Sequence, residues 1–212
     1  MKKVLPLLLL AFVMCQCNIQ SGNQNKPDEN SNRAKYPEKF TEEYVGVRTM
    51  ELAEKLCNCD PTNVYAFNNV FTQEYEDLLK EALALPEGID GDGPADWLWI
   101  ELAGGLCSLQ AVTELKMDDE KATAKMKSGE NDGEEFSLSF VNGDWKIDDL
   151  GNCSKKYLKN LIQESRERYQ SMDWLELINE LEQRGYSKTE AVEASEALRQ
   201  NIETYFELYP NK

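Results

Sequence analysis

Apolar and polar residues alternate between Ser108 and Leu150, which is typical of strands with one buried face. The clearest run is FSLSFVNGDWKIDDL, from Phe136 to Leu150. Its Asn-Gly pair favours a type I′ turn, because that turn needs a positive φ at both central residues. A two-residue turn at Asn142-Gly143 fixes the register of the hairpin. The expected cross-strand pairs are Val141 with Asp144, Phe140 with Trp145, and Leu138 with Ile147.

A second hairpin precedes this one, with its turn expected at Asp118-Asp119. That turn would pair Leu115 with Ala122, Thr113 with Ala124, and Ala111 with Met126. The two hairpins together predict a four-stranded antiparallel sheet with one apolar and one polar face. The inward positions are expected to be Leu109, Ala111, Leu115, Met126, Leu138, Phe140 and Ile147. The outer face is expected to carry Gln110, Glu114, Lys116, Lys121, Thr123, Lys125, Lys127, Ser137, Ser139, Lys146 and Asp148, with Val112 and Val141.

Helical spacing of apolar residues predicts helices before the sheet. Asp60-Pro61 is a helix start, with Asp at the N-cap and Pro at the first helical position. The expected helices are residues 38–56, a segment from Asp60 that includes Phe71, one opened by Thr72 and ended by Pro86 and Gly88, and residues 97–106. Residues 86–96 are predicted to be a loop.

A helical tail follows the sheet. Residues 154–170 form one predicted helix, and an apolar stripe from Trp174 to Leu181 forms the next, with Gly185 after its end. Ser187 and Glu190 make a capping box for a last helix that runs to Pro210. That helix carries a stripe of Val192, Ser195, Leu198, Ile202, Tyr205 and Tyr209. We expect the tail to pack onto the sheet domain; binding of a partner through Leu175, Leu177 and Tyr209 is the alternative.

The N-terminus reads as an export signal. Lys2 and Lys3 precede an apolar run that ends at Cys15 and Cys17, which suggests a lipoprotein with a lipidated cysteine; cleavage and secretion is the alternative. An even number of remaining cysteines favours Cys17, whereas the position of the apolar run favours Cys15. Polar residues 18–37 are an expected disordered tether. The expected organisation is therefore 1–17 signal, 18–37 tether, 38–153 α+β domain and 154–212 helical extension, on a membrane-anchored protein of the cell envelope.

Charge and composition exclude several classes of function. The formal net charge of −16 repels phosphate backbones, so nucleic acid is not an expected partner. The chain has no histidine, which excludes histidine-dependent catalysis and histidine metal sites. No cofactor is indicated. Because the outer sheet face is rich in lysine, which is costly to bury unpaired, we expect the domain to be a monomer.

Four cysteines remain in the body of the chain: Cys57, Cys59, Cys107 and Cys153. In an exported protein they are expected to form disulfides, and free buried thiols are the alternative. A bond between Cys57 and Cys59 would close a very small ring, so we expect this pair to cross-link to Cys107 and Cys153 in one of two ways. The spacing does not suit a four-cysteine zinc site.

Several segments resemble the nuclear transport factor 2-like superfamily, and within it a bacterial family of exported domains of unknown function. The resemblance is carried by FTQEYEDLLKEAL (71–83), DWLWIELA (96–103), the strand with Ala122 and Ala124, and FSLSFVNGDWKIDDL (136–150). It covers about half of the chain, from about Phe40 to Asp149, and leaves out the helical tail. It implies an α+β fold in which helices cover one face of a curled sheet, with a pocket between them. It implies no activity, because such folds host enzymes and binding modules alike.

The candidate ligand-pocket residues are Tyr44, Trp97 and Trp99. The expected function is a non-catalytic binding or scaffold module that holds a small apolar ligand or a protein partner. One alternative is an enzyme with a carboxylate base in the pocket of this cone-shaped fold, between the sheet and the helices; Asp149 is the first acid among the expected inward positions. The other is a structural subunit of an envelope complex that assembles through the helical hairpin of the C-terminal tail.

Overall fold

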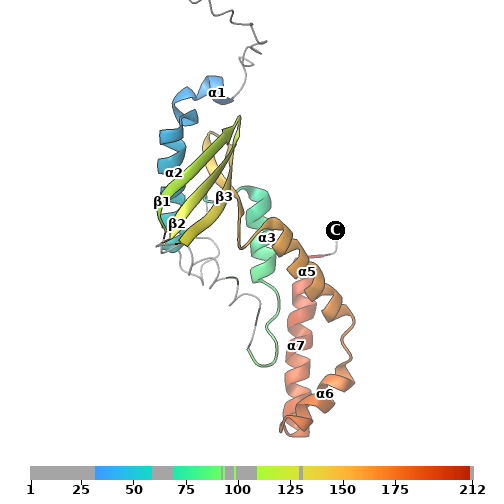
Figure 1. Cartoon of the computed structure of the whole chain (residues 1–212). Helices are drawn as coiled ribbons and strands as arrows, with labels where there is room; N and C mark the ends of the chain where they lie inside the picture. Colours follow the sequence, from blue (N-terminus) through green and yellow to red (C-terminus); the bar gives the residue numbers. More distant parts are fainter. Residues whose placement is uncertain are drawn as a thin grey trace, which may run out of the picture.

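The computed structural model describes residues 32–58, 69–91, 93, 98, 109–128 and 131–210. The fold is α+β: a four-stranded antiparallel sheet in the order β1-β2-β3-β4, with helices packed around it (Figure 1). Its elements are α1 (Asn32–Lys35), η1 (Pro37–Phe40), α2 (Glu42–Cys57), α3 (Gln73–Leu83), β1 (Leu109–Asp118), β2 (Lys121–Ser128), β3 (Asn131–Val141), β4 (Asp144–Leu150), α5 (Lys155–Gln170), α6 (Trp174–Gln183) and α7 (Lys188–Leu208). The predicted fold class is confirmed.

The β3–β4 hairpin has the predicted turn and register. Asn142 and Gly143 both adopt a positive φ, of 55° and 81°, as a type I′ turn requires. The cross-strand pairs are Val141 with Asp144, Phe140 with Trp145, and Leu138 with Ile147, as predicted.

The β1–β2 hairpin differs from its prediction. Its turn is Asp119-Glu120, one residue later than expected, and Leu115 therefore lies opposite Ala124. Asp119 adopts a φ of 53°, a conformation that aspartate tolerates better than most residues. Irregularities in β1 also place Val112, rather than Ala111, opposite Met126. Val112 consequently packs inward and Ala111 is exposed, because a bulge reverses which residues face the core.

The helices before the sheet begin at side-chain caps. Thr41 caps α2 by accepting a hydrogen bond from the Tyr44 amide, and so divides the predicted 38–56 helix into η1 and α2. Thr72 precedes α3, as predicted. Phe71 is not helical; it forms a parallel bridge with Ile147 of β4. Most of the helix predicted from Asp60 lies outside the described residues.

The core lies between the inward sheet face and the helices. Trp145 is fully buried at its centre, with its ring 5.4 Å from that of Phe40 and 5.5 Å from that of Phe140. The Trp145 Nε1–H donates to the Lys39 carbonyl at 2.7 Å, which joins η1 to the sheet. The buried sheet residues are Ala122, Ala124, Met126, Phe136, Leu138, Phe140, Trp145, Ile147 and Leu150.

Helices α5, α6 and α7 form an arm, here residues 155–208, that leads away from the sheet and returns toward α3 (Figure 1). Gly185 adopts a φ of 102° just after α6, and Ser187 with Glu190 forms the predicted capping box of α7. The buried face of α7 contains Ala191 in place of the predicted Val192, which is 45% exposed. Within the described residues, we find no helix with the length and apolar character needed to cross a membrane.

Candidate functional site

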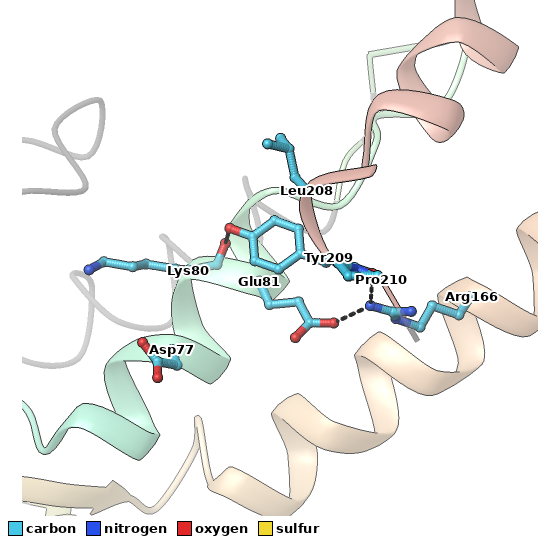
Figure 2. A pocket seen from close by; sticks show the side chains of 7 residues that line it. All are labelled: Asp77, Lys80, Glu81, Arg166, Leu208, Tyr209 and Pro210. Atoms are coloured by element: carbon cyan, nitrogen blue, oxygen red, sulfur yellow. Dashed lines mark hydrogen bonds and ion pairs between the residues drawn. The ribbon is translucent and has the colours of Figure 1, made fainter. Parts of the chain in front are cut away.

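A surface pocket of about 540 Å³ lies where the arm meets α3 (Figure 2). Residues of α3, α5 and the end of α7 line it, so it forms a joint between the sheet domain and the arm. The lining residues are Asp77, Lys80, Glu81, Arg166, Leu208, Tyr209 and Pro210. Pockets between packed units are common places for ligand binding, so this joint is the candidate site.

Arg166 of α5 joins three helices at the pocket. Its Nη2 donates to Glu81 Oε1 at 2.7 Å and to the Tyr209 carbonyl at 2.6 Å (Figure 2). The guanidinium also lies 5.3 Å from the ring centroid of Tyr205, a cation–π contact. Burial alone would lower the pKa of Arg166, but the hydrogen bond to Glu81 and the further interactions with Tyr205 and the Glu81 charge together outweigh it, and the pKa is raised. Arg166 is therefore a permanently charged hub.

Tyr205 of α7 and Tyr209, just after its end, complete the joint. The Tyr205 hydroxyl donates to Glu81 Oε1 at 3.2 Å, and the Tyr209 hydroxyl lies 3.4 Å from the Lys80 carbonyl. Burial, together with the Glu81 carboxylate, raises the pKa of Tyr205 to about 12. The same two causes raise the pKa of Tyr209. Both hydroxyls are therefore protonated donors at neutral pH.

The remaining charges at the joint are held within α3. Lys80 forms an ion pair with Glu76, one turn earlier, and this hydrogen bond raises the pKa of Lys80. Asp77 accepts a hydrogen bond from Gln73 at 2.7 Å. The shifted pKa values of Lys80, Arg166 and the tyrosines all move away from neutrality, whereas general acid–base catalysis favours a pKa near the working pH. This chemistry suits a structural joint better than a catalytic centre.

Two further ties hold the arm to the segment that follows α3. The Tyr169 hydroxyl of α5 donates to the Pro86 carbonyl at 3.0 Å. Arg184, just after α6, forms an ion pair with Asp90. The arm is thus attached along its length as well as at the joint.

A second polar cluster lies where β4 passes into α5. Lys155 donates to Asp148 Oδ1 and to Glu74 Oε2, both at 2.8 Å, and Thr72 donates to the same Asp148 oxygen at 2.8 Å. Burial alone would raise the pKa of Asp148, but the hydrogen bonds from Lys155 and Thr72 outweigh it and hold that pKa below its ordinary value. Because Asp148 is an anchor for Lys155 and Thr72, the cluster fixes α3 and α5 against the sheet.

The Asp148 cluster should make the protein less stable in acid. A carboxylate whose folded-state pKa is depressed contributes stability above its unfolded pKa of about 3.9, and this contribution is lost as the pH falls through the folded value. Asp148→Asn should therefore lower the free energy of unfolding by about 1 kcal/mol at pH 7 and flatten its decline below about pH 4. Urea unfolding at several pH values measures this. The control Glu193→Gln, at an exposed position of α7, should change neither the free energy of unfolding at pH 7 nor its decline in acid. If Asp148→Asn lost stability in acid as steeply as the unmodified protein, the proposed role of Asp148 would be contradicted.

The structure places only some of the sequence-predicted site residues. Tyr44 lies on α2 and packs, half-buried, against the core. Trp97 and Trp99 lie outside the described residues, as do Cys15, Cys17, Cys59 and Cys107. The role of Tyr44, Trp97 and Trp99 in lining a ligand pocket stays a prediction.

The two described cysteines differ. Cys57, the last residue of α2, is disulfide-bonded. Cys153 is a buried thiol, so the predicted disulfide of Cys153 is absent. Cys153 is enclosed in the core just before α5, where its backbone carbonyl accepts a hydrogen bond from the Tyr75 hydroxyl at 2.7 Å, and it matches the alternative of a buried thiol.

The joint between α3, α5 and α7 was not predicted from the sequence. Its members are far apart in the chain: Arg166 and Glu81 are separated by 85 positions. One signal was present: Arg166 follows Ile162 by four residues and so continues the apolar face of α5. A basic residue on a buried helix face requires an acidic partner, which here is Glu81.

Comparisons with known proteins add no relatives: no family model, no curated protein and no solved structure matches the chain. Within the described residues, no group of three or more cysteine, aspartate or glutamate side chains is arranged to hold a metal ion.

Proposed function

We propose that this protein is a non-catalytic scaffold of the cell envelope, attached to a membrane at its N-terminus, which presents the arm to a protein partner. The observation that carries the proposal is the arm itself. It projects from the sheet domain, and α6 lies at the end of the molecule opposite α1, where the chain enters the fold (Figure 1).

The construction of the arm supports a presenting role. Arg166 fixes its base to α3, the Tyr169 hydroxyl ties the end of α5 to the Pro86 carbonyl, and an exposed ion pair between Arg184 and Asp90 adds a weaker contact in its far part. A surface held in place before binding loses less conformational entropy when a partner arrives. Leu175, in the first turn of α6, is 74% exposed and offers an apolar contact on this far part.

The sheet supports a partner better than a small apolar ligand. The inward side chains of β2, β3 and β4 are buried against helices, with Trp145 and Ile147 fully enclosed. These positions are therefore filled by protein. Asp149, the acid expected among the inward positions, accepts hydrogen bonds from the Leu150 and Lys155 amides, which is a structural role.

Site-specific photo-cross-linking tests the proposal. The full chain, expressed in its own cells, would carry a photoreactive residue at Leu175 or at Leu208, a leucine of similar exposure (68%) at the base of the arm. We expect one discrete cross-linked protein from position 175 and none from position 208. Equal products from both positions, or none from position 175, would contradict a partner site on the far part of the arm.

The variant Cys15→Ala/Cys17→Ala should leave the membrane fraction, because it lacks the cysteines that would carry the lipid. Retention of this variant in the membrane fraction would contradict lipid attachment.

A further inference from the structure

The outer face of the sheet has a distinct pattern of lysines and hydroxyls. In one row across the strands, Lys121 lies opposite Ser139, which lies opposite Lys146. In the next row, Lys116 lies opposite Thr123, which lies opposite Ser137. We call the set the lysine–hydroxyl face: Lys116, Lys121, Thr123, Ser137, Ser139 and Lys146.

Three of the acids near this face are paired, whereas Asp118 and Glu135, which lies opposite Lys125, form no ion pair within the described residues. Asp148 is bonded to Lys155, and Asp144 accepts from Arg48 Nη2 at 2.7 Å. Glu114 lies 2.7 Å from Lys116 and 3.2 Å from Lys125.

The lysines of this face are not neutralised to the same extent. Lys121 and Lys146 form no ion pair with any residue that the structure describes, although the exposed Asp118 lies opposite Lys121 in the register. Lys116 is 74% exposed, and ion pairs this exposed hold their partners weakly. In a chain of net charge −16, the face therefore retains accessible positive charge.

The position of this face relates it to the N-terminal attachment. Asn32, the first described residue, donates to Glu120 Oε1 at 2.9 Å, and Glu120 is next to Lys121. Lys39 Nζ donates to the Gly143 carbonyl at 2.7 Å, in the turn that precedes β4. The chain thus enters the fold beside the turns that border the lysine–hydroxyl face.

We propose that the lysine–hydroxyl face docks on anionic phospholipid headgroups. This inference rests on the proposed membrane attachment, which keeps the face close to the lipid at a high effective concentration. Lysine ammonium groups and the Thr123 and Ser137 hydroxyls can donate hydrogen bonds to phosphate oxygens, whereas the Ser139 hydroxyl already donates to Asp148. Each lysine near an anionic leaflet also gains electrostatic attraction. Repulsion from the rest of the acidic chain is screened beyond about 8 Å at physiological salt.

Lysine footprinting on the full chain tests this docking. The chain would be reconstituted in vesicles of phosphatidylcholine or of an equal mixture with phosphatidylglycerol, labelled with an amine-reactive reagent and read by mass spectrometry. On anionic vesicles Lys121 and Lys146 should label about fivefold more slowly than on neutral ones, which corresponds to the attraction expected for one lysine. Lys188, in the first turn of α7, should label equally on both.

Variants separate docking from general electrostatics. Anionic vesicles should also protect Lys116 and the neighbouring Lys125 from labelling. In the variant Lys121→Gln/Lys146→Gln, these two lysines should be labelled on anionic vesicles as fast as on neutral ones. The control Lys188→Gln/Arg199→Gln changes the net charge equally on α7 and should leave their protection intact. If protein that floats with the vesicles is labelled equally on both lipids, the docking inference alone is overturned. Binding of this face to an acidic protein, without protection of its lysines by lipid, would also overturn the docking inference alone. Failure to float would overturn both the docking and the proposed attachment.

Discussion

Trp145→Ala should lower the free energy of unfolding by about 3–5 kcal/mol, the usual cost of emptying a buried tryptophan site. The side chain is fully buried between the rings of Phe40 and Phe140, at centroid distances of 5.4 and 5.5 Å. Its removal would also leave the Lys39 carbonyl without its hydrogen bond from Nε1. Because that bond holds η1 on the sheet, amides of η1 and the first turn of α2 should exchange faster than the rest.

Trp145→Phe is the matched control for this prediction. It keeps an aromatic ring against Phe40 and Phe140 but removes the N–H donor, so it should cost about 1–2 kcal/mol. Urea unfolding of both variants measures the difference. A cost below about 1 kcal/mol for Trp145→Ala would show that this residue is not a central part of the core.

Arg166→Met should release the arm from α3 at a cost of about 2–3 kcal/mol. The substitution keeps an unbranched side chain but leaves Glu81 without its cation and the Tyr209 carbonyl without its donor. Loss of one member of a buried ion pair costs about 3–5 kcal/mol, and the partial exposure of this pair, 14% and 23%, reduces that figure. Hydrogen exchange should accelerate in the last turns of α7 while the amides of β3 and β4 keep their protection.

Two comparisons decide whether the Arg166 effect is specific. Arg168→Met removes an arginine two residues later, whose guanidinium lies 5.1 Å from the Tyr169 ring, and should cost less than 1 kcal/mol. Arg166→Met/Glu81→Met removes both charges and should recover part of the lost stability, because no carboxylate is left unpaired. Equal exchange in all three variants would show that Arg166 does not hold the arm.

The sequence predicted those parts of the fold that depend on local chemistry. The β3–β4 register followed from Asn142-Gly143, and the start of α7 followed from the pairing of Ser187 with Glu190. β1 was predicted less well, because its alternation is interrupted by irregularities that no residue type marks. Val112 and Ala111 exchanged their expected faces for that reason.

The candidate site depends on contacts between distant residues, and these were not predictable from the pattern alone. Helical spacing showed that α5 and α7 each have an apolar face, but not which partners these faces meet. Tyr209 was expected to pack onto the sheet domain, with partner binding as the alternative; it contacts Lys80 of α3 and, through its carbonyl, Arg166. Leu177 is partly buried against the core, whereas Leu175 remains exposed, as a partner-binding role requires.

The joint also sets an order of folding. The hairpin of β3 and β4 closes over two residues, whereas Tyr205 meets Glu81 across 124 residues and Tyr209 meets Lys80 across 129. Contacts between residues so far apart form late, because a long loop must first be closed. The sheet is therefore expected to form before α7 reaches α3, and a chain that is still emerging from a ribosome or a translocon exposes the α3 surface until its last helix has arrived.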